Sequence, residues 1–452
     1  MSLTKSLINA KKKQGKLHIS YTLLRRTLIM NKYNKRSAHC LGIALLSLTG
    51  VMQNVYAAEA FSSQSPWMLG DWKGQRRVLE QKGYTFSLGY TGEMASLIDA
   101  KYDSNHGTEY ADQFALGAHF DLNKILAWHD TQAQITLTQR NGRSLSQTAD
   151  ALDGHQSSVQ EVWGRGQTWR LTDFWIQKQF LQQTLDIKVG RFGEGEDFNT
   201  FDCDFQNLAL CGSQVGNWVG DQWYNWPVSQ WAVRAKYHLQ PDVYAQVGMY
   251  EYNPENLKRS QGFNLSSDGS KGAIIPVEAV WSPKVGVAQR AGEYRVGYYY
   301  STADASDIQN PTQTSHKQGM WLVAKQQLTS DRDNPERGLS GFINLTLHDS
   351  DTNAVSNMQN VGLVYTGLSA TRPKDALAVG VARISINDDI ADQQAALNQA
   401  RQNEEYDMEV YYGIHANDWL TIRPNIQYIR HVGAYKNGEN VWVGGIKFQT
   451  AF

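Results

Sequence analysis

The sequence is short of cysteine, with only three among 452 residues, and it has no long hydrophobic run after residue 57. Because a membrane-spanning helix needs about 20 consecutive apolar residues, the missing run excludes helical spans from that part of the chain. The GxSxG, HExxH and Walker motifs are also missing, and the histidines, His119 and His415 among them, form no pattern typical of catalysis. We therefore expect no enzyme activity, no cofactor or metal, and no nucleic-acid partner.

The one clearly hydrophobic segment lies near the N-terminus and has the pattern of a secretory signal. A basic patch at residues 32–36 precedes an apolar run at 41–52, and small residues follow it. This run is too short, and wrongly flanked, for a stable membrane helix. We expect translation to start at Met30 and cleavage to follow Ala57, with Ala60 as the alternative site. The competing interpretation is a buried N-terminal helix.

Export would place the mature chain in an oxidising compartment and would remove Cys40 with the signal. Cys203 and Cys211 then remain as an even pair, which predicts a disulfide that closes a short loop. Such a small ring stabilises by roughly 2 to 3 kcal/mol at most, so we expect it to shape the loop rather than support the fold. No histidine lies at ligand spacing beside these thiols, which argues against a metal site.

Beyond residue 83 the chain is dominated by short segments in which apolar and polar residues alternate. In residues 114–122, Phe114 and Leu116 fall on one face while His119 and Asp121 fall on the other. This period of two is typical of a β-strand with one apolar and one polar side. About sixteen such segments occur, among them 86–90, 133–137, 185–189, 231–237, 243–249, 294–298, 343–347, 408–414 and 422–428.

The polar faces of these segments distinguish a membrane barrel from a soluble sheet. A soluble β-protein also alternates, with its apolar face toward a core. Here the opposite face carries the charges of Arg140, Arg234, Lys236 and Arg295. A closed barrel in lipid accommodates such charges around a wet lumen and pairs every backbone group within its wall. We therefore predict an integral β-barrel surrounded by outer-membrane lipid, with aromatic side chains at both interfaces.

The last segment supports the same prediction. Trp442, Ile446, Phe448 and Phe452 share one face of a final strand that ends on an aromatic residue. A terminal phenylalanine on such a strand resembles the assembly signal of outer-membrane barrels. We expect Phe452 to engage the barrel-assembly machinery.

Several longer stretches resemble one family in order along the chain. They are SPWMLGDWKGQRRVLEQKGYTFSLGYTGE, ITLTQRNGRS, VGRFGEGEDFNTFDCDFQNLALCG, GDQWYNWPVSQWAVRAKY, YAQVGMYEYNP and the closing strand. They look like the carbohydrate-selective, OprB-type porins of Gram-negative bacteria, and the likeness runs from about Trp67 to Phe452. The resemblance implies a single 16-stranded outer-membrane barrel, a short N-terminal periplasmic helix, and diffusion of glucose and similar sugars.

The resemblance also divides the chain and gives the disulfide a place. Residues 1–57 would form an upstream extension and cleaved signal, 58–83 a periplasmic segment with a short helix, and 84–452 the barrel. If the chain starts in the periplasm, the connection after the fifth strand, at about 193–229, is the third outside loop. In porins this loop folds into the lumen and narrows it. The predicted disulfide would then pin a constriction loop that has no sheet to support its shape.

Arginines are the first candidates for the constriction. Arg140 lies on the lumen side of its strand, and the resemblance also places a constriction arginine there. Arg170 is the second choice by resemblance. Strict alternation with Phe174 and Ile176 would turn it toward lipid, so a bulge or a loop position must be assumed. The neighbouring candidates are Arg143 and Arg165.

Acidic and aromatic side chains of the segment 193–229 are expected to face these arginines across the lumen. The set comprises Glu194, Glu196, Asp197, Asp202, Asp204, Asp221, Trp223 and Trp226, with Arg234, Lys236 and Arg295 on the wall. Opposite charges across a narrow gap can exchange hydrogen bonds with the hydroxyls of a sugar, while indole faces cover its C–H side. Lys188 and Lys447 are expected to be solvated wall residues.

Two segments have the composition of helices. Trp72–Lys82 predicts an amphipathic helix beneath the barrel, which we expect to pack rather than to gate the pore. Ile390–Glu405 predicts a surface helix within an outside loop.

The expected substrates, glucose and similar small carbohydrates, depend on the resemblance. The arginines and lysines of the wall leave a porin for small organic anions as the alternative. A secreted carbohydrate-binding β-protein is a more distant one. For the assembled state, both a monomer and a homotrimer stay open.

Overall fold

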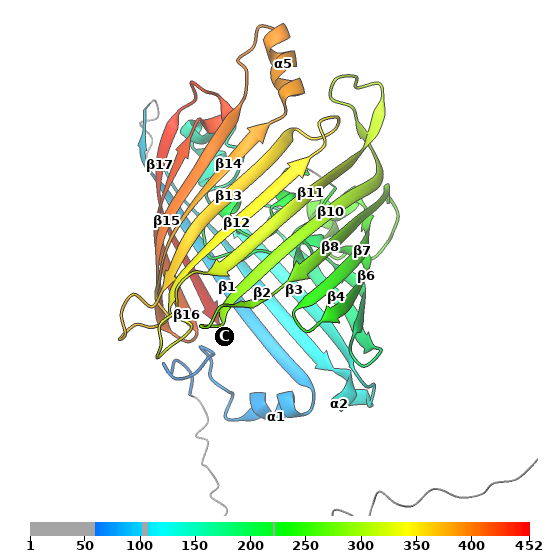
Figure 1. Ribbon diagram of the computed structural model, residues 1–452, viewed down its shortest axis with the longest axis vertical. Coiled ribbons are helices and arrows are strands. Elements are labelled where there is room, and N and C mark those ends of the chain that lie inside the picture. The colour runs from blue at the N-terminus through cyan, green and yellow to red at the C-terminus, as the bar shows by residue number, and fades with distance from the viewer. Residues whose placement is uncertain (1–58, 102–106, 220–221) are drawn as a thin grey trace, which may run out of the picture. The chain divides into compact units, whose positions relative to one another are not determined.

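Residues 59–101, 107–219 and 222–452 are described by the computed structural model, and they form a closed antiparallel β-barrel (Figure 1). Sixteen long strands make up the wall, as predicted, while β9 has only two residues and pairs with the start of β10. The strands are β1 (Tyr84–Ala100), β2 (Thr108–Asp121), β3 (Thr131–Gly142), β4 (Trp169–Phe180), β5 (Leu185–Phe192), β6 (Gln230–Gln240), β7 (Val243–Tyr252), β8 (Gly272–Trp281), β9 (Lys284–Val285), β10 (Arg290–Ser306), β11 (Thr314–Gln327), β12 (Gly338–His348), β13 (Val355–Thr366), β14 (Ala376–Ile386), β15 (Glu404–Asn417), β16 (Leu420–Arg430) and β17 (Asn440–Ala451).

The barrel closes between its first and last strands. β1 is hydrogen-bonded to β2 on one side and to β17 on the other, in a register that places Glu93 opposite Lys447. Closure leaves the sheet without a free edge, so the backbone groups of every strand can pair within the wall.

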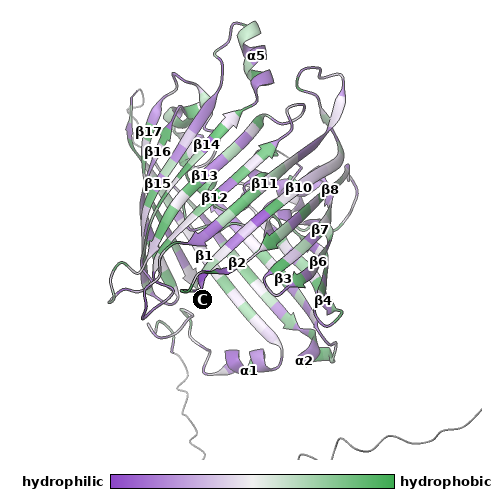
Figure 2. Ribbon diagram, in the orientation of Figure 1, coloured by the Kyte–Doolittle hydropathy of each residue, from purple (hydrophilic) through white to green (hydrophobic). Residues whose placement is uncertain are grey.

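Side chains alternate between the outside and the inside of this wall. Leu116, Ile135 and Val296 are exposed on the outer face, whereas Thr138 and Arg234 point inward and are buried. Figure 2 shows the resulting alternation of hydrophobic and hydrophilic residues along the strands. The pattern that predicted the barrel is therefore present in its wall.

The helices are short and belong to the segment before β1 and to the connections between strands. They are α1 (Gln75–Gln81), α2 (Leu122–Leu126), α3 (Leu145–Thr148), α4 (Val215–Trp218) and α5 (Asp388–Ala396). In the part of the chain that the structure describes, no helix is long and apolar enough to cross a membrane.

The helix predicted at Ile390–Glu405 was placed too far along the chain. Its observed counterpart, α5, ends at Ala396, and β15 begins at Glu404. The carboxylate of Glu405 accepts hydrogen bonds from the backbone N–H groups of Gln156 and Gly433, which holds this residue at the rim of the barrel. The predicted helix beneath the barrel does occur, as α1, within the segment 72–82.

The two ends of the barrel differ in the length of their connections. Short connections, such as residues 181–184 and 241–242, lie at the end that carries α1, α2 and the C-terminus (Figure 1). Long ones, above all the β3–β4 loop (residues 143–168) and the β5–β6 loop (residues 193–229), start from the end that carries α5. Short turns are typical of the periplasmic side of an outer-membrane barrel, which agrees with the prediction of a periplasmic helix before the first strand.

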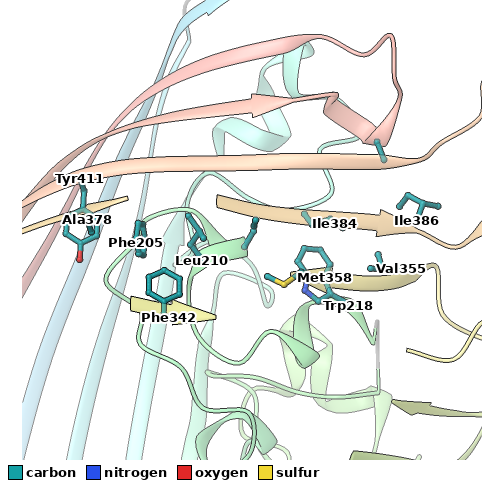
Figure 3. Close-up of a cluster of buried hydrophobic side chains, with 13 residues drawn as sticks. Phe205, Leu210, Trp218, Phe342, Val355, Met358, Ala378, Ile384, Ile386 and Tyr411 are labelled. Atoms are coloured by element: carbon teal, nitrogen blue, oxygen red, sulfur yellow. The ribbon is translucent and has the colours of Figure 1, made fainter. Parts of the chain in front are cut away.

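The β5–β6 loop packs against the inner wall of the barrel. The ring of Phe205 contacts those of Phe342 and Tyr411, with centroids 5.9 and 4.9 Å away. Leu210 and Trp218 belong to the same buried cluster, together with residues of β12 to β15 (Figure 3). These strands lie on the opposite side of the barrel from β5 in the strand order. The loop therefore crosses the interior.

The segment before β1 is tied to the end of the last strand. The guanidinium of Arg76, on α1, lies 4.2 Å from the ring centroid of Trp67 and 4.4 Å from that of Trp72. Its Nη2 donates to the backbone oxygen of Phe452 at 2.8 Å. Trp419 Nε1 donates to the backbone oxygen of Ser62, in the segment before β1, at 3.0 Å. We call this arrangement the terminal clasp.

Candidate functional site

A cavity of about 590 Å³ lies inside the barrel, between the wall and the two long loops. β1, β2, β3 and β17 supply the wall, and the β3–β4 and β5–β6 loops supply the remaining surface. Its lining includes Thr91, Gln113, Arg140, Ser157, Ser158, Glu161, Trp163, Arg165, Glu196, Cys203, Cys211, Ser213, Asn217, Asn225, Trp226 and Gln449. We call it the central cavity.

Arg140 reaches the central cavity from β3, on the inward side that its strand position predicts. Its Nε donates to Gln113 Oε1 at 2.8 Å, and its Nη1 donates to the backbone oxygen of Trp163 at 3.4 Å. Trp226 Nε1 donates to the same oxygen of Gln113 at 2.9 Å, which places an indole beside the guanidinium. The side-chain amide of Gln113 and the backbone oxygen of Trp163 thus hold Arg140 at the edge of the cavity.

The acidic partner of Arg140 is Glu161, which sequence reasoning missed. Glu161 belongs to the β3–β4 loop, and its Oε2 lies 3.9 Å from Arg140 Nη2. Its other oxygen, Oε1, lies 3.0 Å from Lys447 Nζ. The ion pair of Arg140 is thus made with the β3–β4 loop, while Glu196 of the β5–β6 loop lines the same cavity as Arg140. A single glutamate in an irregular loop has no periodicity that could have revealed the pair.

The acidic residues at the start of the β5–β6 loop have other partners. Glu194 is fully buried, and its carboxylate accepts from Tyr224 N at 3.1 Å and from Gln230 Nε2 at 2.8 Å. Burial raises the pKa of Glu194 to about 8. These bonds tie the first turn of the loop to its return strand, so Glu194 supports the loop and does not line the cavity.

Glu196 and Asp197 are anchored to the wall beneath the loop. Lys188 Nζ lies 3.4 Å from Glu196 Oε2 and 2.9 Å from Asp197 Oδ2. Arg234 is paired with Asp186 at 2.5 Å and with Asp197 at 3.4 Å. Only Glu196 of this group also lines the central cavity.

Two other candidate arginines, Arg165 and Arg143, occupy different environments. Arg165 lines the cavity and donates to the backbone oxygen of Gly216 at 3.3 Å. Arg143 does not line it; its side chain is 72% exposed and pairs with Glu109 at 2.9 Å.

Arg170 is turned inward by the bulge that strict alternation required. The register of β3 and β4 shifts between Thr136 and Leu137, which gives β4 one extra residue. Its guanidinium donates to three backbone oxygens at 2.7 to 2.8 Å, those of Arg165, Asn256 and Leu257. Arg170 therefore joins two loops and does not line the cavity.

The two tryptophans of the β5–β6 loop have different surroundings. Trp226 lines the cavity, as described above. Trp223 is fully buried, and its ring contacts those of Tyr299 and Trp321 at centroid distances of 5.7 Å. It anchors the loop within an apolar cluster.

Cys203 and Cys211 are joined by a disulfide, as predicted, and both line the central cavity. Cys40, Asp221 and the predicted signal lie outside the described residues. The remaining charges predicted for the lumen are paired or packed: Asp202 with Lys325, Asp204 with Arg423, Arg295 with Glu278 and Glu293, and Lys236 over the ring of Tyr244.

Lys188 and Lys447 are not solvated wall residues, contrary to expectation. The side chain of Lys188 is 6% exposed and that of Lys447 is fully buried. Both lie on the inner face, but the two long loops fold over them and supply carboxylates and carbonyl oxygens. Alternation gave the correct face, while the cover came from segments without a strand pattern.

One group of described residues has the side chains of a metal site. His155, Glu405 and Asp407 offer ligand atoms within 4.8 Å of one another. His155 Nε2 already lies 3.2 Å from Asp407 and 3.6 Å from Glu405, as an ion pair. Glu161 also lies near the two cysteines, but their sulfurs are bonded to each other and are not free to bind a metal.

Comparison with known proteins agrees with this geometry. Residues 105–452 match the sequence model of the carbohydrate-selective porin, OprB family. Porin B of Pseudomonas aeruginosa is 51% identical over 451 residues, which cover 93% of this chain and 99% of that protein. The putative porin QuiX of Acinetobacter baylyi is 38% identical over 434 residues, covering 91% and 99%.

A solved structure shares the whole barrel. The high-pH structure of Pseudomonas putida OprB has 51% identity and a TM-score of 0.84, and the match covers 87% of this chain and 100% of that one. Sequence and fold agree over nearly the full length of these proteins. The chain therefore belongs to the OprB family of carbohydrate-selective porins and is an outer-membrane β-barrel.

Proposed function

We propose that this porin lets glucose and similar small carbohydrates diffuse passively through the central cavity, and that it catalyses no reaction. The observation that carries the proposal is the mixed lining of the cavity. Hydroxyl, amide and charged groups line it together with the indoles of Trp163 and Trp226. A pore selects through the donors, acceptors and charges along its path. This mixture suits a solute that has many hydroxyls and an apolar C–H face.

The balance of charge in the lining favours a neutral solute over an organic anion. The lining includes two arginines, Arg140 and Arg165, and two glutamates, Glu161 and Glu196. The cations of the wall that suggested an anion pore are paired: Lys188 and Arg234 with Asp197, Arg295 with Glu278, and Lys447 with Glu161. The surplus that favoured anions is therefore neutralised within the protein.

Arg140 would make the main polar contact with a passing sugar. Its planar guanidinium can donate two parallel bonds to neighbouring hydroxyls. Glu161 and Gln113 would accept from other hydroxyls, and the amides of Asn225 and Gln449 can do either. Each contact replaces a bond to water and is weak in net terms, which permits release as well as entry.

Liposome swelling tests this proposal. Liposomes that contain the purified porin are diluted into glucose, a disaccharide or a small carboxylate of similar size. We expect fast swelling in glucose and slower swelling in the disaccharide and the carboxylate. Faster entry of the carboxylate than of glucose would favour the organic-anion porin instead. A protein that stays monodisperse in buffer without detergent would support the secreted carbohydrate-binding alternative.

Lipid and the assembly machinery are the other proposed partners. The exposed apolar side chains of the outer face would contact outer-membrane lipid, and Phe452 would present the assembly signal. A Phe452→Ala variant should assemble more slowly, with less heat-modifiable protein in the membrane. Cross-linking in the native membrane would distinguish a monomer from a homotrimer.

A further inference from the structure

Lys447 is a fully buried lysine on β17, the strand that closes the barrel. Its ammonium lies 3.0 Å from Glu161 Oε1 and 3.3 Å from Glu93 Oε1. It also donates to the backbone oxygens of Cys203 at 3.1 Å and Phe205 at 2.9 Å. One cation therefore contacts the wall and both long loops.

Each of these contacts leads to the central cavity. Glu161 holds Arg140 through its other carboxylate oxygen. Cys203 belongs to the disulfide that lines the cavity. Glu93 strengthens the link, because its Oε2 accepts from Val162 N at 3.1 Å, next to Glu161 in the β3–β4 loop. Lys447 itself is absent from the lining, so any effect on a solute must pass through these neighbours.

The energetics favour a specific role for this ammonium. A buried charge is costly unless it is paired and hydrogen-bonded, and a buried carbonyl without a donor is costly too. Lys447 forms ion pairs with two carboxylates and donates hydrogen bonds to two carbonyls at once. Removing the ammonium would leave all four without that partner, and the loops are the parts that can move away.

We propose that Lys447 is a positioning residue that sets the aperture of the pore. It would do so by holding in place Glu161 and the turn that the Cys203–Cys211 disulfide closes. The inference rests on the proposed function, since it concerns the path of the same solute. In this role Lys447 selects by size and by the placement of Arg140, without touching the sugar.

The test is a Lys447→Met variant, which keeps the length of the side chain and removes its charge. The strand pairing of β17 depends on backbone hydrogen bonds, so the barrel should still form. It should then show the heat-modifiable mobility in gel electrophoresis that is typical of a folded barrel. Losing a charge-assisted hydrogen bond shifts a loop equilibrium roughly tenfold toward the open arrangement. We expect a higher and noisier single-channel conductance and a loss of discrimination between glucose and a disaccharide.

A matched control is available in Lys317, on β11. It is another buried lysine of the inner face, and its Nζ donates to the backbone oxygen of Thr352 at 2.8 Å and to Asn353 Oδ1 at 3.3 Å. Those residues belong to a loop that does not line the cavity. Lys317→Met should leave conductance and size selection unchanged. Equal changes in both variants would show that Lys447 only stabilises a loop in a general way, and would overturn the proposal.

Two further variants separate positioning from stability. Lys447→Arg keeps the charge and should restore part of the size selection. Glu161→Gln removes the shared partner, so its effect should not add to that of Lys447→Met; fully additive effects would overturn the proposal. If Lys447→Met fails to assemble, Glu161→Gln alone tests the link from the loop side, and unchanged conductance and selectivity would refute it. A wild-type porin that passes no glucose would contradict the proposed function, whereas the conductance comparison would still decide the role of Lys447.

Discussion

At the scale of single residues, Arg140 connects the barrel wall to the central cavity through its contacts with Gln113, Trp163 and Glu161. The inward direction of Arg140 followed from its position in β3, and the register places it opposite Gln113. Its acidic neighbour did not follow, because Glu161 reaches it from an irregular loop. Strand periodicity encodes which face a side chain occupies. An ion pair across a lumen depends on loop conformations that leave no repeat in the sequence.

Replacing Arg140 with alanine should widen the solute path and weaken sugar contacts. We expect a higher single-channel conductance. The block of the ion current by sugar should weaken by roughly 1 to 2 kcal/mol, which is close to the lower end of the range for a hydrogen bond to a charged group. Arg140→Lys should restore charge selectivity but only part of the sugar affinity, since an ammonium lacks the planar fork. Arg143→Ala is the control, because that side chain is exposed and outside the cavity. Unchanged conductance and block in Arg140→Ala would show that the solute does not contact this residue.

At the scale of elements, strands were predictable and their irregularities only in part. The bulge in β4 was required by the direction assumed for Arg170, and the register shift supplies it. The role of Arg170 in joining two loops was not predictable, because the backbone oxygens that it bonds belong to irregular segments. The β5–β6 loop was placed by strand counting and by its cysteine pair. Its apolar anchors, such as Phe205 and Trp223, had no distinguishing pattern.

Removing the disulfide should loosen the β5–β6 loop before it affects the barrel. A ring with a sequence separation of 8 stabilises by roughly 2 to 3 kcal/mol, and the barrel wall does not depend on it. A Cys203→Ser, Cys211→Ser double variant should keep its heat-modifiable mobility while the loop becomes sensitive to protease and the conductance changes. Peptide mapping without reductant provides the control. Two free thiols in protein from the native membrane would contradict the bridge itself.

The β3–β4 loop should loosen at high pH. Burial lowers the pKa of His155, but the carboxylates of Asp407 and Glu405 outweigh it and raise the pKa to about 9. A raised pKa means that the charged histidine stabilises the folded loop fully below its ordinary value of 6.5, and that this contribution is lost as the pH rises through about 9.

Conductance recorded between pH 6 and 10 should therefore change near pH 9 in the wild type. His155→Gln should remove this transition. At low pH the variant should already show the conductance that the wild type reaches only above about pH 9, where its histidine is uncharged. The half-buried His431 offers a control, since it lies outside the His155 ion pair and His431→Gln should preserve the transition. A wild-type profile that is flat across this range would show that the His155 pair does not hold the loop.

At the scale of the whole molecule, the wall was predictable and the interior was not. The alternating strands, the closing segment and the family likeness together define a barrel of sixteen strands. The interior contains two folded loops, buried lysines and apolar clusters, which the sequence presents only as irregular stretches. Lys188 and Lys447 illustrate the difference, since their face was correct and their burial was not.

The terminal clasp predicts a separation between two kinds of stability. Arg76→Ala should release the segment before β1, because the guanidinium bridges two indoles and the backbone oxygen of Phe452. We expect proteolysis of that segment to speed up while the barrel keeps its heat-modifiable mobility. Arg77→Ala is the control, because it removes from the same helix a half-exposed side chain whose ion pair is with Asp71 and not with Phe452. Loss of the barrel itself in Arg76→Ala would show that the clasp is part of the fold's core stability.

The clasp also has a consequence in time. Its two halves are separated by 376 positions in the sequence, so Arg76 cannot contact the oxygen of Phe452 until the last strand lies beside the first. Protection of the leading segment should therefore be the last event of biogenesis. The time at which this segment becomes resistant to protease would therefore mark the completion of barrel assembly.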